Sequence, residues 1–542
     1  MVAFFTCAVK LMRDWFKRIG SLLGVSASST ELPPDLLSQL GIGQASELRP
    51  TLQSAMAGNP VFSVPALLEQ ARLAGWGAGE QQKLAIYADF FSGQSSIGYQ
   101  RLMDNAEARL DFDLFMTAMT YCYKHDRFAE GYQLLKSFEL DRAQRLDLSE
   151  YYPCAAYAAF NGGGTVHEAA GYLEQALNEG LHTALVVVNA YVIFFEAGLL
   201  ERLAELNRLI RNNFASDTEA IYTLGNVELG RDYYPEGFRL MEARYHRPET
   251  LKWLSPTLIQ AARWQRKPLA GKRLFIHGEQ GVGDVLMMAR YLSLLEQQGA
   301  KVILECPDSV SPLLAHNFPG CELVPLQVGK EIEQPFDFWT GMMSLPFHFN
   351  TTADNVPCTA GYLSVPPEQA AYWHDRVKQL NVGRRPKVGI AWSGNPRHRF
   401  DRRRSITFEK LVPHLRAVSQ VQFFALQTDL PTMGPAQPVN VSDELLTFAD
   451  TAALIAEMDL VITVDTSTVH LAGALGKQTW LLLPYRYEWR WSLAGENNNW
   501  YDTVKVIRQR TSGNWDELLS DLFQHRLPSW IEDMKTSGTM CV

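Results

Sequence analysis

The chain has 542 residues, more than one hydrophobic core accommodates, so we expect about two to four domains. Hydrophobic residues make up 46% of it and charged residues 20%, a balance that excludes an intrinsically disordered chain. The formal net charge of −9 argues against a general nucleic-acid-binding protein, because such proteins usually present a basic face. We therefore expect no nucleic-acid partner.

The cysteines and the N-terminus bear on location. The seven cysteines include no CxxC pair, so they indicate neither a zinc site nor a disulfide framework, and we expect a reducing, cytoplasmic location. No stretch approaches about 18 uninterrupted apolar residues, so no transmembrane helix is expected. Residues 1–25 predict an amphipathic helix with Lys10 and Arg13 among its apolar positions. We interpret it as a helix that packs on the protein; the alternative is peripheral contact with a membrane.

A helical region with an internal repeat follows. Residues 26–59 predict a linker and a helical lead-in, and helical apolar patterns then succeed one another over 60–262. Aligned apolar positions recur with spacings of 38, 34 and 34 residues, at Phe128, Val166, Leu200 and Tyr234. Small residues keep the same register upstream, at Ala118, Ala156 and Ala190. A period near 34 residues is typical of tetratricopeptide repeats, which stack into a superhelix with a concave groove. A plain helical bundle is the alternative.

After Pro268 the pattern changes to short apolar strands that alternate with helices. The expected strands span 273–278, 301–306, 322–326, 387–394, 421–427, 460–465 and 479–484. We assign 263–384 to a first lobe, 385–530 to a second lobe and 531–542 to a tail. The predicted fold class is therefore a helical repeat superhelix followed by two Rossmann-like α/β lobes. Ligands of such sheets bind at the carboxyl ends of the strands, so the turns there are the candidate sites.

The first candidate turn follows the first strand and is rich in glycine. It contains Gly278, Gly281 and Gly283, and Asp284 comes directly after them. Glycines let a backbone approach a ligand, and a helix N-terminus favours negative charge. Asp284 can take a proton from an acceptor hydroxyl. The alternative is a purely structural turn in which this carboxylate complements the helix dipole.

The second candidate turn opens the second lobe and leads into a basic stretch. The candidate nucleotide-binding residues here are Ser393, Gly394, Asn395, Arg404, Ser405 and Gln427, of which the last ends the next expected strand, 421–427. Arginine supplies bidentate donors and serine supplies a hydroxyl, a combination that suits a phosphate or diphosphate. The alternatives are a solvated loop and a basic patch for a protein partner.

The third candidate turn has the most specific sequence. The strand over 460–465 ends at Asp465, and Thr466 and Ser467 then lead into a small-residue helix that contains His470. Helix N-terminal N–H groups and hydroxyls can receive phosphate oxygens. His470 lies one turn into the helix, where it can donate to a phosphate; the alternative is a packed core histidine.

The first and third turns resemble a known family. Gly281-Val282-Gly283-Asp284 resembles the (L/V)GD turn of heptosyltransferase-type, family 9 glycosyltransferases, and Asp465–Ala472 resembles their D-(T/S)-(G/S)-x-x-H-x-A signature. The resemblance implies the GT-B fold, with an acceptor-side first lobe and a nucleotide-sugar second lobe. In that family the aspartate of the GD turn is the proposed base, which corresponds to Asp284. These enzymes place a lysine where this chain has Arg402–Ser405, which puts a heptose donor in doubt.

Four longer stretches, 261–291, 389–396, 448–477 and 482–491, resemble bacterial proteins that join tetratricopeptide repeats to such a domain. This closer resemblance covers about residues 100–542. Some of these relatives glycosylate flagellin with nonulosonic acids and bind the acceptor with their repeats. The resemblance implies an inverting transfer from a nucleotide-sugar donor to hydroxyls of a protein acceptor such as flagellin. No cofactor and no metal are expected, since the one Asp-x-Asp motif, Asp111–Asp113, lies in the helical part. Two alternatives stay open: a transferase that acts on lipopolysaccharide, and a non-catalytic repeat scaffold with a degenerate transferase domain.

Overall fold

The computed structural model of the chain describes residues 72 and 77–536, apart from 92–93, 126, 144–145, 360, 382, 397, 399–400, 429, 431–437, 486, 492–494 and 512. The predicted N-terminal helix, the linker, the start of the repeat region and the end of the tail lie outside the described residues. The chain divides into two compact units, Met1–Leu224 and Gly225–Val542. Within the described ranges, no helix is both long and apolar enough to cross a membrane.

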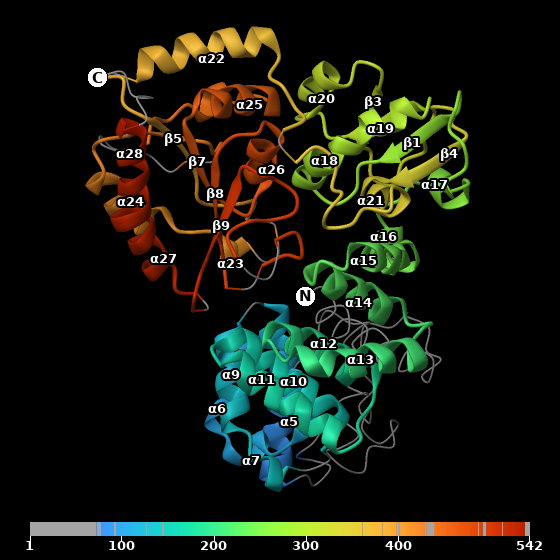
Figure 1. Ribbon diagram of the computed structural model, residues 1–542. Helices are drawn as coiled ribbons and strands as arrows, with labels where there is room; N and C mark the ends of the chain where they lie inside the picture. Colours follow the sequence, from blue (N-terminus) through green and yellow to red (C-terminus); the bar gives the residue numbers. More distant parts are fainter. Residues whose placement is uncertain are drawn as a thin grey trace. The chain divides into compact units, whose positions relative to one another are not determined.

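The described part of the first unit is built from helices joined by short turns (Figure 1). They are α5 (Ala78–Phe91), α6 (Ser95–Asp104), α7 (Ala106–Arg109), α8 (Phe112–Lys124), α9 (Phe128–Ser137), η2 (Leu140–Arg142), α10 (Leu148–Gly162), α11 (Val166–Asn178), α12 (Ala184–Glu196), α13 (Leu200–Asn213) and α14 (Thr218–Gly230), which crosses the boundary between the units. α10 packs against both α9 and α11. Ala118, Ala156 and Ala190 are completely buried. The helical region is confirmed; its tetratricopeptide character stays a prediction.

Side-chain caps explain why several of these helices begin where they do. Thr165 precedes α11 and accepts the N–H of Glu168 on its hydroxyl at 3.0 Å. Asp147 and Thr183 cap α10 and α12 in the same way. Each cap satisfies a backbone donor that the first helical turn leaves without an internal partner.

The second unit continues with helices and then forms the first α/β lobe. The helices before the sheet are α15 (Tyr234–Met241), η3 (Glu242–His246), α16 (Pro248–Leu251) and α17 (Pro256–Gln260). The parallel sheet has the order β3-β2-β1-β4, with β1 (Arg273–His277), β2 (Lys301–Cys306), β3 (Glu322–Pro325) and β4 (Phe338–Gly341). The other helices are α18 (Val282–Met288), η4 (Ala289–Tyr291), α19 (Leu292–Gln297), α20 (Ser311–Asn317), η5 (Met342–Ser344) and α21 (Leu345–His348).

The second lobe contains a larger parallel sheet. Its order is β6-β5-β7-β8-β9, with β5 (Lys387–Ala391), β6 (Gln422–Ala425), β7 (Leu460–Val464), β8 (Thr479–Leu483) and β9 (Val504–Arg508). The helices are α22 (Pro367–Leu380), α23 (Asp401–Arg404), α24 (Phe408–Ala417), η6 (Ser442–Glu444), α25 (Phe448–Glu457), α26 (Ser467–Ala474), α27 (Trp515–Asp521), η7 (Leu522–Arg526) and α28 (Leu527–Thr536). α24, α27 and α28 lie on one face of the sheet, and α25 and α26 lie on the other (Figure 1).

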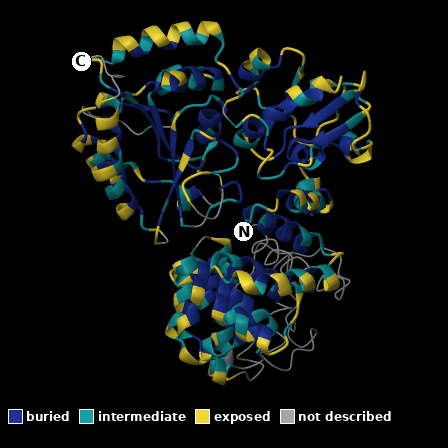
Figure 2. Cartoon of the chain, viewed as in Figure 1, coloured by how far each residue is buried: buried dark blue, intermediate teal, exposed yellow. Residues whose placement is uncertain are grey.

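Helices on both faces explain why the central strands read as continuous apolar runs. All residues of β7 and β8 are buried, and the strands of both sheets are mostly dark blue in Figure 2. A parallel sheet covered on both faces needs apolar side chains in both directions along each strand. The prediction of two parallel α/β lobes after a helical region is therefore confirmed.

Two strands and two boundaries differ from the predictions. β4 was not predicted, and β9 was missed because this edge strand exposes Lys505 in mid-sequence. Residues 242–260, expected to be repeats, pack against the first sheet, since Tyr245 lies in one apolar cluster with strand residues such as Phe275. α28 runs past the expected start of the tail at residue 531 because Ile531 is buried in the core of the second lobe.

Candidate active site

The turn between β1 and α18 lies directly on the first turn of α26. A Cβ atom placed on Gly283 would stand 2.8 Å from Cδ2 of His470 and 3.4 Å from Cα of Ser467. Any larger residue at this position would therefore force the imidazole ring to move. The close approach brings together the two turns that carry the family resemblance, one from each lobe.

Asp284 lies at this junction, and both of its carboxylate oxygens have partners. Oδ2 accepts the N–H of Gly281, the N-cap residue of α18, at 3.1 Å. Oδ1 accepts a hydrogen bond from Nη2 of Arg490, which the second lobe contributes. The side chains of Asp284 and Arg490 are 15% and 9% exposed, so the ion pair is largely shielded from water. An ion pair of this kind is stronger than one at the surface.

Arg490 was not singled out as a site residue, but it lies in residues 484–491, the aromatic segment after β8, whose sequence suits either a lining of the donor pocket or a core or lid segment. Its guanidinium carbon lies 4.7 Å from the centre of the Trp489 ring, and Nη1 lies 3.6 Å from Oε2 of Glu488. Burial lowers the pKa of Arg490, but the carboxylates of Asp284 and Glu488 outweigh it and hold that pKa above its usual value. Nε of Arg490 is buried and has no hydrogen-bond partner within the described residues.

The turn between β7 and α26 organises its own backbone. Thr466 is the N-cap residue of α26, and its hydroxyl accepts the N–H of Thr468 at 3.3 Å. Arg404, at the end of α23, donates from Nη1 to the carbonyl oxygen of Asp465 at 2.8 Å. Ser467 is the first residue of the helix. A cation therefore stands beside a helix N-terminus, an arrangement that suits an anion.

The carboxyl group of Asp465 is buried in the same turn. Burial raises its pKa to about 6, the nearby Glu488 adds to this, and Arg490 and Arg404 oppose it. Asp465 therefore changes charge close to neutral pH, unlike an ordinary aspartate.

His470 is enclosed by aromatic side chains. Nδ1 lies 3.0 Å from the hydroxyl of Tyr501, and the ring stacks on Trp491 with centroids 5.5 Å apart. Burial lowers the pKa of His470 well below its usual range, and the nearby Arg490, Arg290 and Arg404 lower it further. The imidazole is therefore neutral at pH 7, with one ring N–H to donate.

Most of the remaining predicted residues fasten the turn after β5. Oε1 of Gln427 accepts the N–H of Ser393 at 3.0 Å, and Nε2 of Gln427 donates to Oγ of Ser393 at 2.6 Å. Oγ of Ser405 accepts the N–H of Gly394 at 2.9 Å and donates to Asp401 at 2.8 Å. Asn395 accepts the N–H of His398 on its carbonyl at 2.8 Å. These side chains shape the turn, whereas Arg404 extends from it to the α26 turn.

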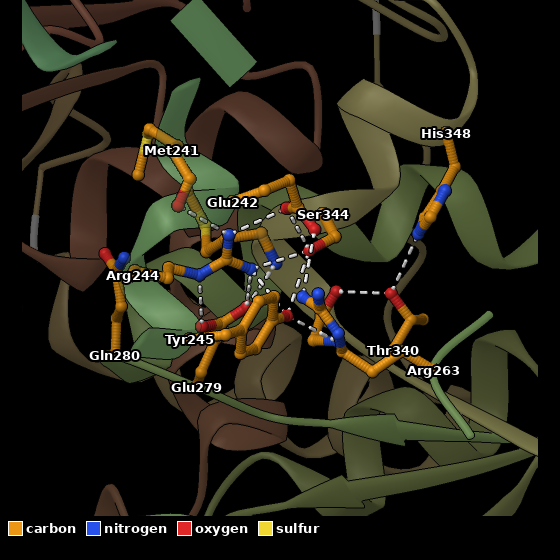
Figure 3. Close-up of polar contacts among 12 residues, drawn as sticks. Met241, Glu242, Arg244, Tyr245, Arg263, Glu279, Gln280, Thr340, Ser344 and His348 are labelled. Atoms are coloured by element: carbon orange, nitrogen blue, oxygen red, sulfur yellow. Dashed lines mark hydrogen bonds and ion pairs between the residues drawn. The ribbon is translucent and has the colours of Figure 1, made fainter. Parts of the chain in front are cut away.

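The turn between β1 and α18 is braced by a buried arginine from η3 (Figure 3). Arg244 donates from Nε and Nη2 to the two carboxylate oxygens of Glu279, at 2.8 and 2.7 Å, and from Nη2 to Ser344 at 2.7 Å. Burial raises the pKa of Glu279, but Arg244 outweighs it and holds that pKa below its usual value. Glu279 precedes Gln280, whose φ of 69° is in the left-handed region that non-glycine residues avoid. The pair thus holds a strained backbone in place.

The strand end beneath this turn is equally tight. Nδ1 of His277 lies 2.6 Å from Oε2 of Glu305 on the neighbouring strand. A Cβ atom on Gly278 would stand 2.1 Å from the carbonyl oxygen of Glu305, so no side chain fits there. Of the three predicted loop glycines, Gly278 and Gly283 serve close packing, and Gly281 serves as the N-cap.

No candidate metal site accompanies these turns. Within the described ranges, no group of three or more His, Cys, Asp or Glu side chains is placed to hold a metal ion. Asp111, from the Asp-x-Asp motif, caps α8 by accepting the N–H of Leu114 at 3.1 Å. Metal-independent chemistry stays a prediction.

Comparisons with known proteins find one curated relative with a significant match. It is Protein FlbA of Caulobacter vibrioides, 26% identical over 313 residues, which cover 52% of this chain and 50% of that protein. The chain thus spans about half the length of the curated relative it matches. No family model matches the chain.

Several solved structures are similar in part. A family 9 glycosyl transferase from Veillonella parvula is 10% identical with a TM-score of 0.33, covering 51% of this chain and 92% of that one. ADP-heptose lipopolysaccharide heptosyltransferase II of E. coli is 14% identical with a TM-score of 0.30, covering 50% and 100%. An O-GlcNAc transferase from Thermobaculum terrenum is 12% identical with a TM-score of 0.23, covering 72% and 94%. Scores of this size do not establish a shared fold or activity.

Proposed function

We propose that the chain is a glycosyltransferase that moves a sugar from a nucleotide-sugar donor to an acceptor hydroxyl. The observation that carries the proposal is the pairing of opposite chemistries at the junction of the two lobes. The first lobe presents the carboxylate of Asp284, and the second presents the N-terminus of α26 with Arg404 and His470 beside it. A base for a hydroxyl and a site for a leaving phosphate are the two requirements of this reaction.

The proposed reaction is a direct displacement. Asp284 accepts the proton of the acceptor hydroxyl while that oxygen forms a bond to the anomeric carbon of the sugar. The bond between the anomeric carbon and the phosphate oxygen breaks, and its electron pair stays on the phosphate. Arg404, Ser467 and His470 then stabilise the charge that develops there, because they lie at the α26 turn. Inversion at the anomeric carbon and independence from a metal follow from the family resemblance.

For the acceptor we propose a protein hydroxyl, with flagellin as the first candidate and a nonulosonic acid as a candidate sugar. The support is the family resemblance together with the array of helices from α8 to α13, since stacked helix pairs commonly present a binding groove. A lipopolysaccharide acceptor is the second candidate. A non-catalytic scaffold is the third, but such a protein has no need of the Asp284 carboxylate at this junction.

The test is a panel of CMP-, UDP-, ADP- and GDP-sugars with the full-length protein, incubated with purified flagellin or with lipopolysaccharide. Transfer of labelled sugar to flagellin, lost in Asp284→Asn and retained in Asp308→Asn, is the expected result. Asp308 is a suitable control because it is an exposed carboxylate just after β2. Transfer of label to lipopolysaccharide instead would show that the acceptor is not a protein. Absence of turnover with every donor and acceptor would refute the proposal of a transferase.

A further inference from the structure

Both oxygens of the Asp284 carboxylate already accept a hydrogen bond in the structure. One accepts from the backbone of Gly281 and the other from Arg490, so a substrate hydroxyl would have to share an oxygen with one of these donors. The ion pair is largely shielded from water, because the side chains of Arg490 and Asp284 are 9% and 15% exposed. An acceptor hydroxyl must therefore compete with a charged donor for the carboxylate oxygen.

Arg490 also has an unused donor. Its Nε is buried and has no hydrogen-bond partner within the described residues. Water is largely excluded as a partner, because the side chain is only 9% exposed. A buried N–H without an acceptor costs free energy, so Nε can gain from an acceptor that a ligand brings. Two further carboxylates, Glu488 and Asp465, act on Arg490 through their charge, and Glu488 stands 3.6 Å from Nη1, beyond hydrogen-bond distance.

The position of Arg490 places it within reach of the α26 turn. Asp284, to which it is bound, follows Gly283, and Gly283 packs on Ser467 and His470. Gln280 is a further partner, since its Oε1 accepts from Nη2 of Arg490 at 3.2 Å. An anion at the N-terminus of α26 would therefore compete with Asp284 for the same guanidinium. Arginine is well suited to either partner, because its planar donors fit both carboxylate and phosphate.

We propose that Arg490 is a catalytic residue that exchanges Asp284 for the donor phosphate, an inference that rests on the proposed function. Without a nucleotide sugar, Arg490 holds Asp284 as an ion pair and the base is masked. When the donor binds, Arg490 turns to the phosphate that will leave, and Asp284 becomes free to accept the acceptor proton. As the C–O bond to the phosphate breaks, Arg490 neutralises the electron pair left on the phosphate oxygen. The exchange makes proton transfer from the acceptor depend on donor binding.

The exchange has a consequence that a simple catalytic base would not show. Asp284→Asn removes the charge that competes for Arg490, so this inactive variant should bind nucleotide more tightly than the wild type. We expect the Kd for the preferred nucleotide to fall about tenfold, a size typical of close charge pairs. Arg490→Gln should raise the Kd, and in that background Asp284→Asn should no longer tighten binding. Glu488→Gln should lower the Kd by a smaller factor, because its contact is longer.

The experiment is a double-mutant cycle by calorimetric titration with CMP, UDP, ADP and GDP. The proteins are wild type, Asp284→Asn, Arg490→Gln and the double variant, with Asp308→Asn as the carboxylate control and Arg490→Lys to preserve charge. Far-ultraviolet circular dichroism and a melting curve establish that each variant folds. Tighter binding by Asp284→Asn that disappears in the double variant supports the exchange.

Two results would overturn it. Unchanged or weaker nucleotide binding by Asp284→Asn would show that Asp284 does not compete for Arg490. Equal tightening with and without Arg490 would show that the removed charge acts on the nucleotide directly. In either case the protein still binds nucleotide, so the proposed function is not contradicted. If none of the nucleotides binds any of the proteins, both the proposed function and the exchange are wrong.

Discussion

The two turns at the lobe junction have the same topology but are stabilised differently. Each joins a central parallel strand to a helix, β1 to α18 and β7 to α26. The α26 turn caps itself through Thr466. The α18 turn instead contains Gln280 in a left-handed conformation and depends on Arg244, a residue 35 positions before Glu279. The α18 turn, which presents the base, thus has a strained backbone that depends on a side chain from another part of the chain. The α26 turn, proposed for phosphate, forms its own N-cap and receives only the cation Arg404 from another segment.

Substitutions in the two turns should therefore differ in whether they affect chemistry or folding. A helix N-terminus offers an anion site through its backbone alone, so its local sequence is tolerant. A carboxylate that must face a substrate needs a fixed backbone, and fixing a strained backbone requires contacts from other parts of the chain. Four substitutions distinguish the two turns.

The largest effect is expected from removal of the base. Asp284→Asn should lower kcat by about 10² to 10⁴, the usual contribution of a general base. The fold should survive, because the side chain is partly exposed and asparagine can still cap α18. Turnover of the preferred nucleotide sugar measures this, with Asp308→Asn as control. A variant that transfers sugar at the wild-type rate would exclude Asp284 as the base.

The brace of the α18 turn should matter mainly for stability. Arg244→Gln leaves the buried carboxylate of Glu279 without its partner, which typically costs about 3–5 kcal/mol. The matched control is Arg239→Gln, which breaks a pair with Glu236 whose side chains are 53% and 35% exposed, and it should cost about 0–1 kcal/mol. Urea unfolding monitored by tryptophan fluorescence compares them. Equal losses in the two variants would mean that the brace is dispensable.

The α26 turn should show a pH effect through Asp465. Its pKa is raised to about 6 in the folded protein, so folding favours the protonated form. The stability that this protonation contributes is fully present below pH 4 and is lost as the pH rises through 6. Asparagine carries no charge at any pH, so Asp465→Asn should be more stable than the wild type at pH 8 by up to about 3 kcal/mol. At pH 4 the two proteins should be similar. Melting curves across this range test the prediction, and a difference that does not depend on pH would contradict it.

The contact between the turns should tolerate only glycine at position 283. Gly283→Ala places a methyl group against His470 and should destabilise the protein by about 1–3 kcal/mol, with a loss of turnover. Gly281→Ala is the control, since a Cβ there lies 3.6 Å from Asp284, an ordinary contact, and the backbone φ of −135° suits alanine. Thermal denaturation and turnover should separate the variants. Equal behaviour would mean that the two turns are not packed together in solution.

The sequence predicted both turns because their signals are local. Glycine, hydroxyl and small residues after an apolar strand are recognisable without a partner, and so were Asp284 and His470. Arg244 carries no such signal, and Arg490 stands out only as part of the segment 484–491, because the importance of each comes from a carboxylate 35 or 206 residues away in the chain. Conversely, Ser393 and Gln427 are polar residues after two neighbouring strands, and their sequence does not show that they bond to each other.

The fold shows the same division. Buried strands with continuous apolar sequence were found, whereas the edge strand β9 was missed because Lys505 interrupts its pattern. Residues 242–260 have helical periodicity, and nothing local distinguishes a helix of the array from one that packs on a sheet.

The most direct test of a two-part transferase site is single-turnover transfer of labelled sugar at increasing enzyme concentration. The midpoint reports the donor Kd and the plateau reports the rate of the chemical step. Asp284→Asn should lower the plateau by about 10² to 10⁴ without raising the midpoint, whereas Arg404→Gln should raise the midpoint about tenfold or more. If Arg404→Gln leaves the midpoint unchanged, or if Asp284→Asn weakens donor binding and leaves the plateau intact, the two turns do not divide the reaction between them.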